Sequence, residues 1–384
     1  MKAGTRKGQR VLVTGARLPA ALEIIKAINA EGAEVWAADS LCITPASISR
    51  HVTGYLRIPS PVFSYSEFRN CIVDIVNKFK FDLIVPVSEE IFFLAQINEE
   101  LLPAILVAPP VHLLRRLHSK LDVLDMAKEC GIRVPHTLKA TSSGELFKAL
   151  EQIPDGIVKP EYSRGAYEIK FPPHQDITLG EVSEFRPLLV QERLEGREIS
   201  TYCVAFNGCV LAQSVYEPLY RVGKGASLYF RPIDSSAADS FVAEFVRKHS
   251  LSGQLSFDIM EERDGSIALI ECNPRATSGV HLLALENHWG GVFWGDRLSN
   301  GQKRTRPCAA KLAVMFLHTL PAIRERRVRK FISDIVVARD SIFSARDPLP
   351  ILGSYLCLLE IMWRSRSWSA KGVRAFTHDI EWNG

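Results

Sequence analysis

Residues 254–275 read QLSFDIMEERDGSIALIECNPR, and this stretch determines the fold more than any other part of the sequence. Two runs rich in apolar residues, Gln254–Glu261 and Ser266–Asn273, predict two strands. Between them lies Asp264-Gly265, a dipeptide typical of a two-residue hairpin turn. The stretch therefore predicts an antiparallel β-hairpin that ends in a short polar motif.

The pairing of these strands brings two carboxylates together. With the turn at that dipeptide, Arg263 pairs with Ser266, and Asp258 lies opposite Glu271. Asn273 is two residues further along the strand and lies on the same face. Like charges directly opposite each other destabilise a sheet unless a counter-ion is present. Oxygen ligands of this kind suit Mg2+ held between protein and phosphates.

A solvated acidic hairpin face is the alternative interpretation of the same residues. The apolar residues around the two carboxylates disfavour it, because they indicate that the hairpin is largely packed. These residues are Phe257, Ile259, Ile267, Leu269 and Ile270. A shift of one residue in the turn would separate the carboxylates, so the hairpin alone leaves both interpretations open.

A second polar motif follows another short apolar run. Gly156–Lys159 predicts a strand that ends in a lysine, and a loop with Ser163 and Gly165 comes next. Small residues allow backbone N–H groups to approach phosphate oxygens, and the lysine adds positive charge. This is not the Walker order, since the lysine precedes the loop and no helix follows. An ordinary strand end is the alternative.

A third motif begins in the predicted strand Leu188–Leu194, which runs into a polar turn ending near Glu198. We call this turn, residues 191–198, the hinge. Its backbone groups can bind the edge of an adenine, and a carboxylate there can accept hydrogen bonds from ribose hydroxyls. An ordinary charged connector is the alternative.

The first hundred residues alternate between strand and helix patterns. Apolar strands are predicted at Arg10–Thr14, Glu34–Ala38 and Leu83–Val87, with amphipathic helices at Ala20–Ala30 and Phe68–Phe79. Buried strands separated by helices indicate a parallel sheet covered on both faces, with ligands at the carboxyl ends of its strands. The prediction for this part is a Rossmann-like layer.

A nicotinamide site is the obvious use of such a layer. The loop Thr14–Pro19 has one glycine, however, where the dinucleotide fingerprint needs three. Asp39 follows the second strand, although a lone Asp at a strand end is more often a cap or turn residue. The sequence therefore disfavours dinucleotide binding.

From residue 111 the pattern changes to α+β, so a boundary is expected within Ala108-Pro109-Pro110. Asn207-Gly208 is a strong hairpin signal between two strands. Besides the strands already given, this part predicts strands at Thr137–Ala140, Tyr167–Phe171, Ser200–Ala205 and Cys209–Ser214 and a helix at Ser240–Lys248.

In this order along the chain, the motifs resemble the ATP-grasp superfamily. The Glu-x-Asn-Pro-Arg motif at 271–275 is similar to the metal-binding strand of carbamoyl phosphate synthetases and carboxylate–amine ligases. The resemblance covers about residues 111–290. It implies an α/β Rossmann-like domain at 1–110, an α+β ATP-grasp domain at 111–305 with a mobile lid near 118–190, and a mostly helical extension at 306–384.

The resemblance also implies which residues bind ATP. The lysines and the small-residue loop would contact phosphates, the hinge would hold adenine, and its final glutamate would hold the ribose. These residues are Lys120, Lys159, Ser163, Gly165, Gln191, Glu192, Leu194 and Glu198.

By the same resemblance, Glu271 would bridge two Mg2+ ions, with Asp258 and Asn273 completing the ligands and Mn2+ able to replace Mg2+. Arg275, with Lys159, would be catalytic and would stabilise charge on the transferring phosphoryl group or on an acyl phosphate. Phosphoryl transfer depends on such positioning and charge neutralisation.

The implied activity is that of an ADP-forming ligase: ATP activates a carboxylate as an acyl phosphate, and an amine attacks it to form an amide. A biotin-carboxylase-like activity is disfavoured, because the chain has no Met-Lys-Met biotin site. An ATP-binding regulatory protein without turnover and a nicotinamide-dependent oxidoreductase are the alternatives from other classes.

Substrate residues are harder to assign. The segment Tyr220–Ser227 is a glycine-rich loop with two cations, which makes Arg221, Lys224 and Ser227 candidates, although solvated loop charges are equally compatible. Glu89 follows a predicted strand, where an acid can bind a substrate amine or, as we favour, cap the next helix.

Composition supports a globular protein, with 23% charged and 47% hydrophobic residues. Eight cysteines without a CxxC pair disfavour a zinc ribbon or a disulfide scaffold. No apolar run approaches the roughly 20 residues of a membrane span. We therefore expect a cytoplasmic protein. The resemblance implies small-molecule carboxylate and amine partners, without nucleic acid, and is compatible with a homodimer.

The last part of the chain is basic. Residues 301–384 hold 15 Lys and Arg against 7 Asp and Glu. A basic run at 324–330 is expected on one helix, and Ile351–Trp368 on another. Packing against the first two domains is the favoured role, with membrane-surface attachment as the alternative. The ending His378–Asn383 has the composition of an ordered segment.

Overall fold

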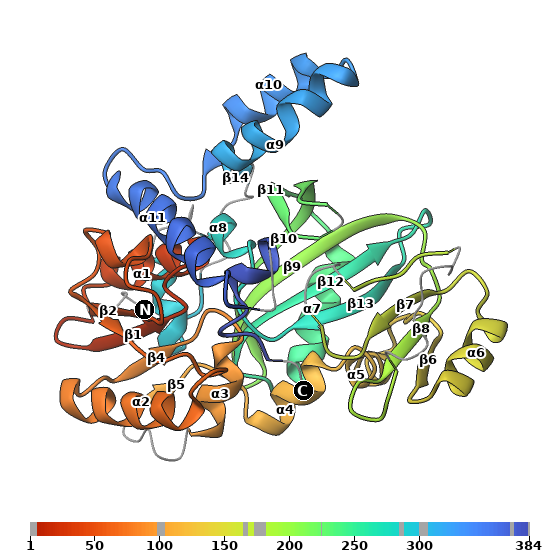
Figure 1. The fold of residues 1–384 in the computed structure, drawn as a ribbon, viewed down its shortest axis with the longest axis horizontal. Coiled ribbons are helices and arrows are strands. Elements are labelled where there is room, and N and C mark those ends of the chain that lie inside the picture. Colours follow the sequence, from red (N-terminus) through yellow and green to blue (C-terminus); the bar gives the residue numbers. More distant parts are fainter. Residues whose placement is uncertain are drawn as a thin grey trace.

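The structure is a computed structural model that describes residues 6–97, 104–163, 168–172, 182–223, 225–283, 288–298, 306–368 and 372–382. Within these residues the strands form three sheets, of five, seven and three strands (Figure 1). The first sheet is parallel, as the sequence predicts, and the other two are mainly antiparallel. The α/β layer followed by α+β structure is therefore confirmed.

The first sheet has its core on both faces. Its strands, in spatial order, are β3 (Gly54–Arg57), β2 (Glu34–Asp39), β1 (Arg10–Thr14), β4 (Leu83–Val85) and β5 (Ile105–Leu106). Helix α1 (Pro19–Ala30) packs on one face, and α2 (Tyr65–Phe79) and α3 (Glu90–Gln96) on the other. The sequence missed β3, which is short and lacks a continuous apolar run, and β5, which has only two residues although it lies in the apolar run Ala104–Ala108.

The second sheet is the largest. Its strands, in spatial order, are β13 (Ile267–Asn273), β12 (Gly253–Glu261), β9 (Arg197–Phe206), β10 (Cys209–Arg221), β11 (Ser227–Pro232), β14 (Cys308–Ala309) and β15 (Arg339–Asp340). The predicted β9–β10 turn is confirmed, with positive φ at both Asn207 and Gly208. One face packs on α4 (Val111–His118), α5 (Asp122–Glu129) and α7 (Ser236–Lys248). The other face meets α1 through a shared core.

The β12–β13 hairpin has the predicted pairing at its polar end but a different turn. Asp258 lies opposite Glu271. The turn, however, has three residues, because the N–H of Glu262 donates to the carbonyl of Ser266 (2.8 Å), and Gly265 has a φ of +84°. That turn shifts the register by one residue, and a bulge at Ile270 shifts it back. The prediction of a two-residue turn is therefore wrong, whereas the pairing of the carboxylates is confirmed.

The third sheet is small. Its strands are β6 (Thr137–Ala140), β8 (Leu188–Gln191) and β7 (Ile157–Pro160), and α6 (Ser143–Gln152) packs against them. β8 ends three residues earlier than predicted, so Gln191 is its last residue and the hinge residues Glu192 and Leu194 lie outside the strand. For the predicted strand Tyr167–Phe171, the described residues show a single bridge between Val158 and Lys170.

The C-terminal part is largely helical. Its helices are α8 (Val280–Leu283), α9 (Lys311–Arg324), α10 (Val328–Val337) and α11 (Leu349–Arg364). In the described residues, short 3-10 segments lie at Ala46–Ile48, Trp289–Trp294 and Gly372–Phe376. The prediction of one helix for the basic run is wrong, because Arg326 has a φ of +55° and separates α9 from α10. Among the described helices, none has the length and apolarity required to cross a bilayer.

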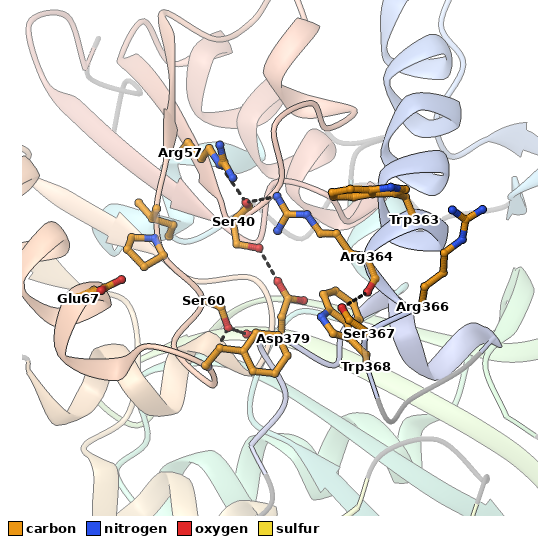
Figure 2. A pocket seen from close by; sticks show the side chains of 13 residues that line it. Ser40, Arg57, Ser60, Glu67, Trp363, Arg364, Arg366, Ser367, Trp368 and Asp379 are labelled. Atoms are coloured by element: carbon orange, nitrogen blue, oxygen red, sulfur yellow. Dashed lines mark hydrogen bonds between the residues drawn. The ribbon is translucent and has the colours of Figure 1, made fainter.

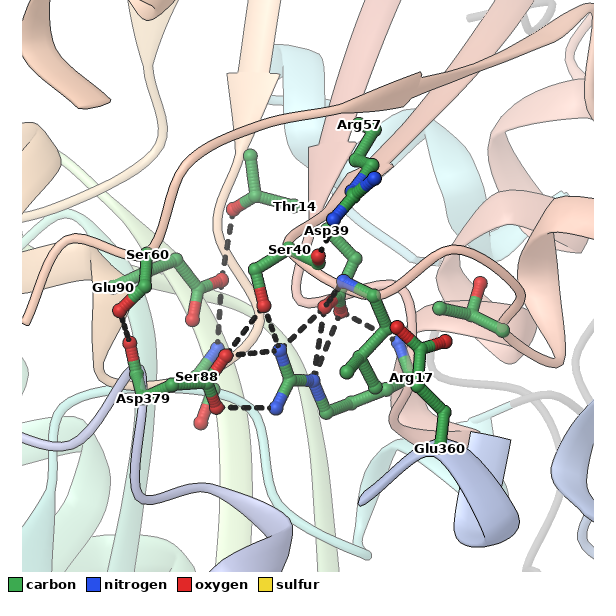
Figure 3. Close-up of polar contacts among 12 residues, drawn as sticks. Thr14, Arg17, Asp39, Ser40, Arg57, Ser60, Ser88, Glu90, Glu360 and Asp379 are labelled. Carbon is green, nitrogen blue, oxygen red and sulfur yellow. Dashed lines mark hydrogen bonds and ion pairs between the residues drawn. The ribbon is translucent and has the colours of Figure 1, made fainter. Parts of the chain in front are cut away.

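The last residues of the chain return to the carboxyl ends of the first sheet (Figure 3). There Arg17 is fully buried and its guanidinium pairs with Asp39 (2.5 Å) and Asp379 (2.6 Å). Ser40 donates to Asp379 as well. Although burial opposes the shift, Arg17 holds the pKa of Asp379 below its usual value. Asp39 is thus neither a ribose ligand nor a helix cap; it fixes the C-terminal segment.

Removal of Arg17 should destabilise the protein, since two buried carboxylates would lose their counter-ion. We expect Arg17→Met to lower the free energy of unfolding by about 3–5 kcal/mol. The matched control is Arg10→Met, because Arg10 pairs with Glu34 where both side chains are nearly half exposed; that change should cost less than about 1 kcal/mol. Urea denaturation of both variants measures this, and equal losses would contradict a structural role for the cluster.

Candidate active site

The carboxylates of the β12–β13 hairpin lie in a polar cluster. Asp258 accepts hydrogen bonds from the Ser200 hydroxyl (2.6 Å) and from the Asn273 amide (3.4 Å). Glu271, opposite Asp258, is partly buried. The sequence placed Asp258, Glu271 and Asn273 together correctly. It missed Ser200, because that contact depends on the pairing of β9 with β12, which local patterns do not show.

Two lysines from other elements reach the same place. Lys120 follows α4; its ammonium lies 3.6 Å from Glu271 and donates to the carbonyl of Ser163 (2.5 Å). Lys159 belongs to β7 of the third sheet and is 1% exposed. The structure thus brings the second and third sheets together around one pair of carboxylates.

The two carboxylates of this pair have opposite pKa shifts. Burial, with the charge of Glu271 nearby, raises the pKa of Asp258. Burial also acts on Glu271, but the ammonium groups of Lys120 and Lys159 outweigh it and lower its pKa. A cation bound between the two carboxylates would oppose both causes of the raised pKa of Asp258, because it would stabilise the ionised form of that carboxyl group.

The donor set fits a hard divalent cation. Two carboxylates and one amide oxygen are the ligand types that Mg2+ prefers, and Mg2+ ordinarily takes its remaining ligands from water and phosphates. The described part of the chain has no cluster of three or more His, Cys, Asp and Glu side chains that could hold a metal ion, and the hairpin itself offers two carboxylates with an amide as the third group. Asn273 also accepts a hydrogen bond from Arg275 (3.1 Å), so its amide oxygen already faces a positive charge.

Lys159 is an unusual buried cation. Burial lowers its pKa to about 8, although the carboxylate of Glu271 opposes the shift. In the described residues its ammonium makes neither an ion pair nor a hydrogen bond within the usual distances. A buried ammonium of this kind destabilises the fold and is typical of a group that awaits an anionic ligand.

Arg275 and Glu89 link the hairpin to the first sheet. The Arg275 guanidinium lies 3.4 Å from the Glu89 carboxylate, and the other oxygen of Glu89 accepts the backbone N–H of Trp382 (3.0 Å). Glu89 stands at the N-cap position of α3, yet its side chain makes no cap hydrogen bond. The helix-cap interpretation is therefore wrong, and Glu89 positions Arg275.

The neighbouring acid, Glu90, was missed. It is buried, and one oxygen accepts hydrogen bonds from the Thr14 hydroxyl (2.8 Å) and the N–H of Val87 (3.0 Å). A side chain at Gly15 would come within 2.9 Å of that oxygen, which explains the glycine. Burial raises the pKa of Glu90. Two acids in succession after a buried strand were the signal for this network.

An aromatic cluster stands behind Glu89. Trp382 stacks on Phe92 with ring centroids 4.5 Å apart, and His118 packs against both. Burial lowers the pKa of His118 to about 4, so this side chain is neutral at pH 7. The C-terminal segment thus supports the acid that holds Arg275.

The hinge residues are fixed by local contacts. Gln191 is buried and donates to the Thr137 hydroxyl (3.0 Å). The carboxylate of Glu192 pairs with Arg133 (2.8 Å), and its N–H donates to the carbonyl of His136 (2.8 Å). Leu194 is half-buried. The Glu192 N–H is thus already used within the protein.

Glu198, predicted to hold the ribose, and Arg221, predicted to bind substrate, form an ion pair with a nitrogen–oxygen distance of 2.6 Å. The Ser227 hydroxyl contacts the carbonyls of Leu219 (2.7 Å) and Tyr229 (2.9 Å) within the β10–β11 hairpin. Ser227 thus has a structural role, and we no longer assign it to a substrate.

Two other predicted site residues, Gly165 and Lys224, lie outside the described residues.

A cavity of about 820 Å³ opens elsewhere, beside the carboxyl ends of β2 and β3 (Figure 2). Arg57 and Arg364 both donate to the carbonyl of Ser40 there, and Trp363 and Trp368 flank it. No residue predicted to bind ATP, metal or substrate lines this cavity. The candidate active site is therefore the hairpin cluster, which is separate from it.

Comparisons with solved structures identify the fold, whereas no family model matches the chain. The chain is similar to N5-carboxyaminoimidazole synthetase from Staphylococcus aureus, with a TM-score of 0.62, 15% identity, and coverage of 80% of this chain and 83% of that one. It is also similar to the biotin carboxylase domain of Hydrogenobacter thermophilus 2-oxoglutarate carboxylase, solved with MgADP and bicarbonate. The TM-score is 0.61 and the identity 16%, with coverage of 78% of this chain and 73% of that one.

A third similar structure is L-amino acid ligase from Bacillus licheniformis (TM-score 0.58, 14% identity, 79% of each chain). These proteins are ATP-grasp enzymes. The chain therefore has the ATP-grasp fold that its motifs predict.

Lys159→Met should stabilise the protein near neutral pH. The folded protein loses the Lys159 proton as the pH rises through about 8, whereas the unfolded chain keeps it to about 10.4. Wild-type stability should therefore rise with pH between these values. We expect the variant to exceed wild type by about 1–3 kcal/mol at about pH 7 and by clearly less at about pH 9.5.

The matched control for this prediction is Lys148→Met, on the exposed face of α6. It should change the free energy of unfolding little, and equally at both pH values. A Lys159→Met variant that is less stable than wild type near neutral pH would show that Lys159 is already compensated without a ligand.

Proposed function

We propose that this protein is an ATP-dependent ligase that activates a carboxylate as an acyl phosphate, forms ADP, and joins the acyl group to an amine. The observation that supports the proposal is the convergence of Asp258 and Glu271 with Lys120 and Lys159. Such a group of acids and cations suits a metal-bound triphosphate, because each charge then has an opposite partner.

We assign metal binding to the hairpin. Glu271 would bridge two Mg2+ ions, or Mn2+ in their place, and Asp258 and Asn273 would supply the other protein oxygens. The metal would neutralise charge on the β- and γ-phosphates. Asn273 would keep its contact to Arg275 through one lone pair, so that metal binding and the position of Arg275 are coupled.

We assign ATP binding to the lysines and the hinge. Lys120 and Lys159 would contact the phosphates, with the loop of Ser163 and Gly165 over them. For adenine, Gln191 and the backbone of Leu194 would act together with the carbonyl of Glu192, since its N–H is used by His136. Glu198 would hold the ribose from its ion pair with Arg221.

We assign the transferring group to Arg275, which lies on the side of the cluster nearest to the first sheet. Its guanidinium is held by Glu89 and Asn273 and is 13% exposed. A fixed cation there would stabilise charge on the phosphoryl group and then on the acyl phosphate. Arg221 and Lys224 would contribute to carboxylate binding.

The rival functions have less support. A nicotinamide cofactor would need the carboxyl ends of the first sheet, where Arg17 and Asp379 are buried against each other. A regulatory protein without turnover would not need Arg275 held beside the paired carboxylates, since ATP binding alone does not require it. We further propose domains at 1–110, 111–305 with a lid near 118–190, and 306–384, and a cytoplasmic location.

The product distinguishes this chemistry from adenylation. We expect that, in a screen of small carboxylic acids with Mg2+ and ATP, hydroxylamine traps the activated acid as a hydroxamate, with one ADP per hydroxamate. In the binding mode proposed above, the positive charges would face the β–γ bridge rather than the α-phosphate, which favours ADP as the product. Lys159→Met should lose at least about tenfold in rate, since contacts to phosphate contribute roughly 1.5–3 kcal/mol, while Lys148→Met should not. Formation of AMP and pyrophosphate would contradict the proposal.

A further inference from the structure

Exposed apolar side chains are concentrated in one part of the chain. Of the 25 large hydrophobic residues that are exposed in the described part of the chain, 18 lie between Leu312 and Trp363. Helices α9 and α10 in this part project from the body of the protein (Figure 1). Exposed apolar surface of this extent marks an interaction site.

On α9 the exposed residues form a continuous stripe. Leu312, Phe316, Leu320 and Ile323 follow one another at spacings of three and four, so they share one face of the helix. Phe316 is 86% exposed. The opposite face, with Val314 and Ala322, is buried against the protein.

On α10 a second stripe consists of Val328, Ile332 and Val336. The contacts of Tyr220, in β10, show which face of each helix points toward the body of the protein. The Tyr220 ring contacts His318 of α9 and Phe331 of α10, with centroids 5.3 and 5.9 Å apart. Both helices therefore turn one face toward Tyr220. The α9 stripe lies on the face opposite His318, and the α10 stripe lies on the flank beside Phe331, where it is exposed.

The same two helices are strongly basic. Residues 311–337 hold six Lys and Arg and two acids. Both acids are already paired: Glu325 with Arg327, and Asp334 with Lys330 (2.7 Å). The remaining guanidinium groups at the connection between the helices are exposed. Apolar stripes beside unpaired cations are the pattern of a helix that lies in a membrane interface.

Helix α11 repeats the apolar part of this pattern, whereas its own arginine, Arg364, is paired with Glu360. Leu352, Tyr355, Leu359 and Trp363 are each at least half exposed, and Trp363 is 68% exposed. The exposed Arg366 follows shortly after the helix. Indole rings and arginines are common where a helix contacts lipid headgroups.

We propose that the outer faces of α9, α10 and α11 form a docking surface for an anionic lipid bilayer, on which the protein lies without crossing it. Charge complementarity favours this occupant. A second copy of the chain would place the same basic helix pair, net +4 over residues 311–337, against itself. Anionic headgroups attract that charge, and the apolar stripes enter the interface beneath them.

Vesicle sedimentation of the full-length protein tests this proposal. The probes are vesicles of phosphatidylcholine alone and of equal parts phosphatidylcholine and phosphatidylglycerol. We expect binding to the mixed vesicles to be at least about tenfold tighter and to weaken with added salt. The triple variant Phe316→Ser, Leu320→Ser, Ile332→Ser should lose this binding, while its melting temperature stays within a few degrees of wild type.

The matched control replaces Phe147 and Phe206, exposed apolar residues outside this surface, by serine. It should bind vesicles like wild type. The proposal is overturned if wild type binds neither vesicle, or if the triple variant binds as wild type does. It is also overturned if gel filtration shows a wild-type dimer that the triple variant converts to a monomer, since a second copy then covers the surface.

Discussion

Two carboxylates that face each other across neighbouring strands are the constraint on which the rest of this site depends. Asp258 and Glu271 are a destabilising pair unless positive charge is brought to them. Lys120 and Lys159 supply part of it, and Lys159 is itself destabilised by burial. Each of these buried charges would destabilise the fold if it stood alone, and the opposite charges in the cluster offset part of that cost. A bound anion together with its metal cation would offset the rest.

The C-terminal segment explains why the candidate active site does not lie at the carboxyl ends of the first sheet, where parallel sheets usually bind their ligands. Asp379 fills the carboxyl ends of β1 and β2 by pairing with Arg17, and Trp382 fixes Glu89 through its backbone N–H. Glu89 in turn holds Arg275. The Rossmann-like layer therefore serves as a support that aims Arg275 at the hairpin.

Local patterns predicted most of the elements, because buried strands and amphipathic helices leave periodic signals. The pairing of Asp258 with Glu271 was predicted correctly, but for an incomplete reason. The three-residue turn shifts the strand register by one residue, and the bulge at Ile270 shifts it back, which no local rule shows. Pairs remote in sequence were not predictable: Arg17 meets Asp379 across 362 positions, and Arg275 meets Glu89. Such contacts depend on how the sheets pack, and one sequence does not encode them locally.

The central claim is that the β12–β13 hairpin holds the metal of a metal–ATP complex. Calorimetric titration with Mg2+ and ATP tests it most directly, with Glu271→Gln compared to Asp264→Asn, a change at the exposed turn of the same hairpin. We predict that Glu271→Gln weakens binding at least about tenfold, since a charge-assisted contact contributes roughly 1.5–3 kcal/mol, and that Asp264→Asn binds like wild type. Equal affinity in wild type and both variants would contradict the claim.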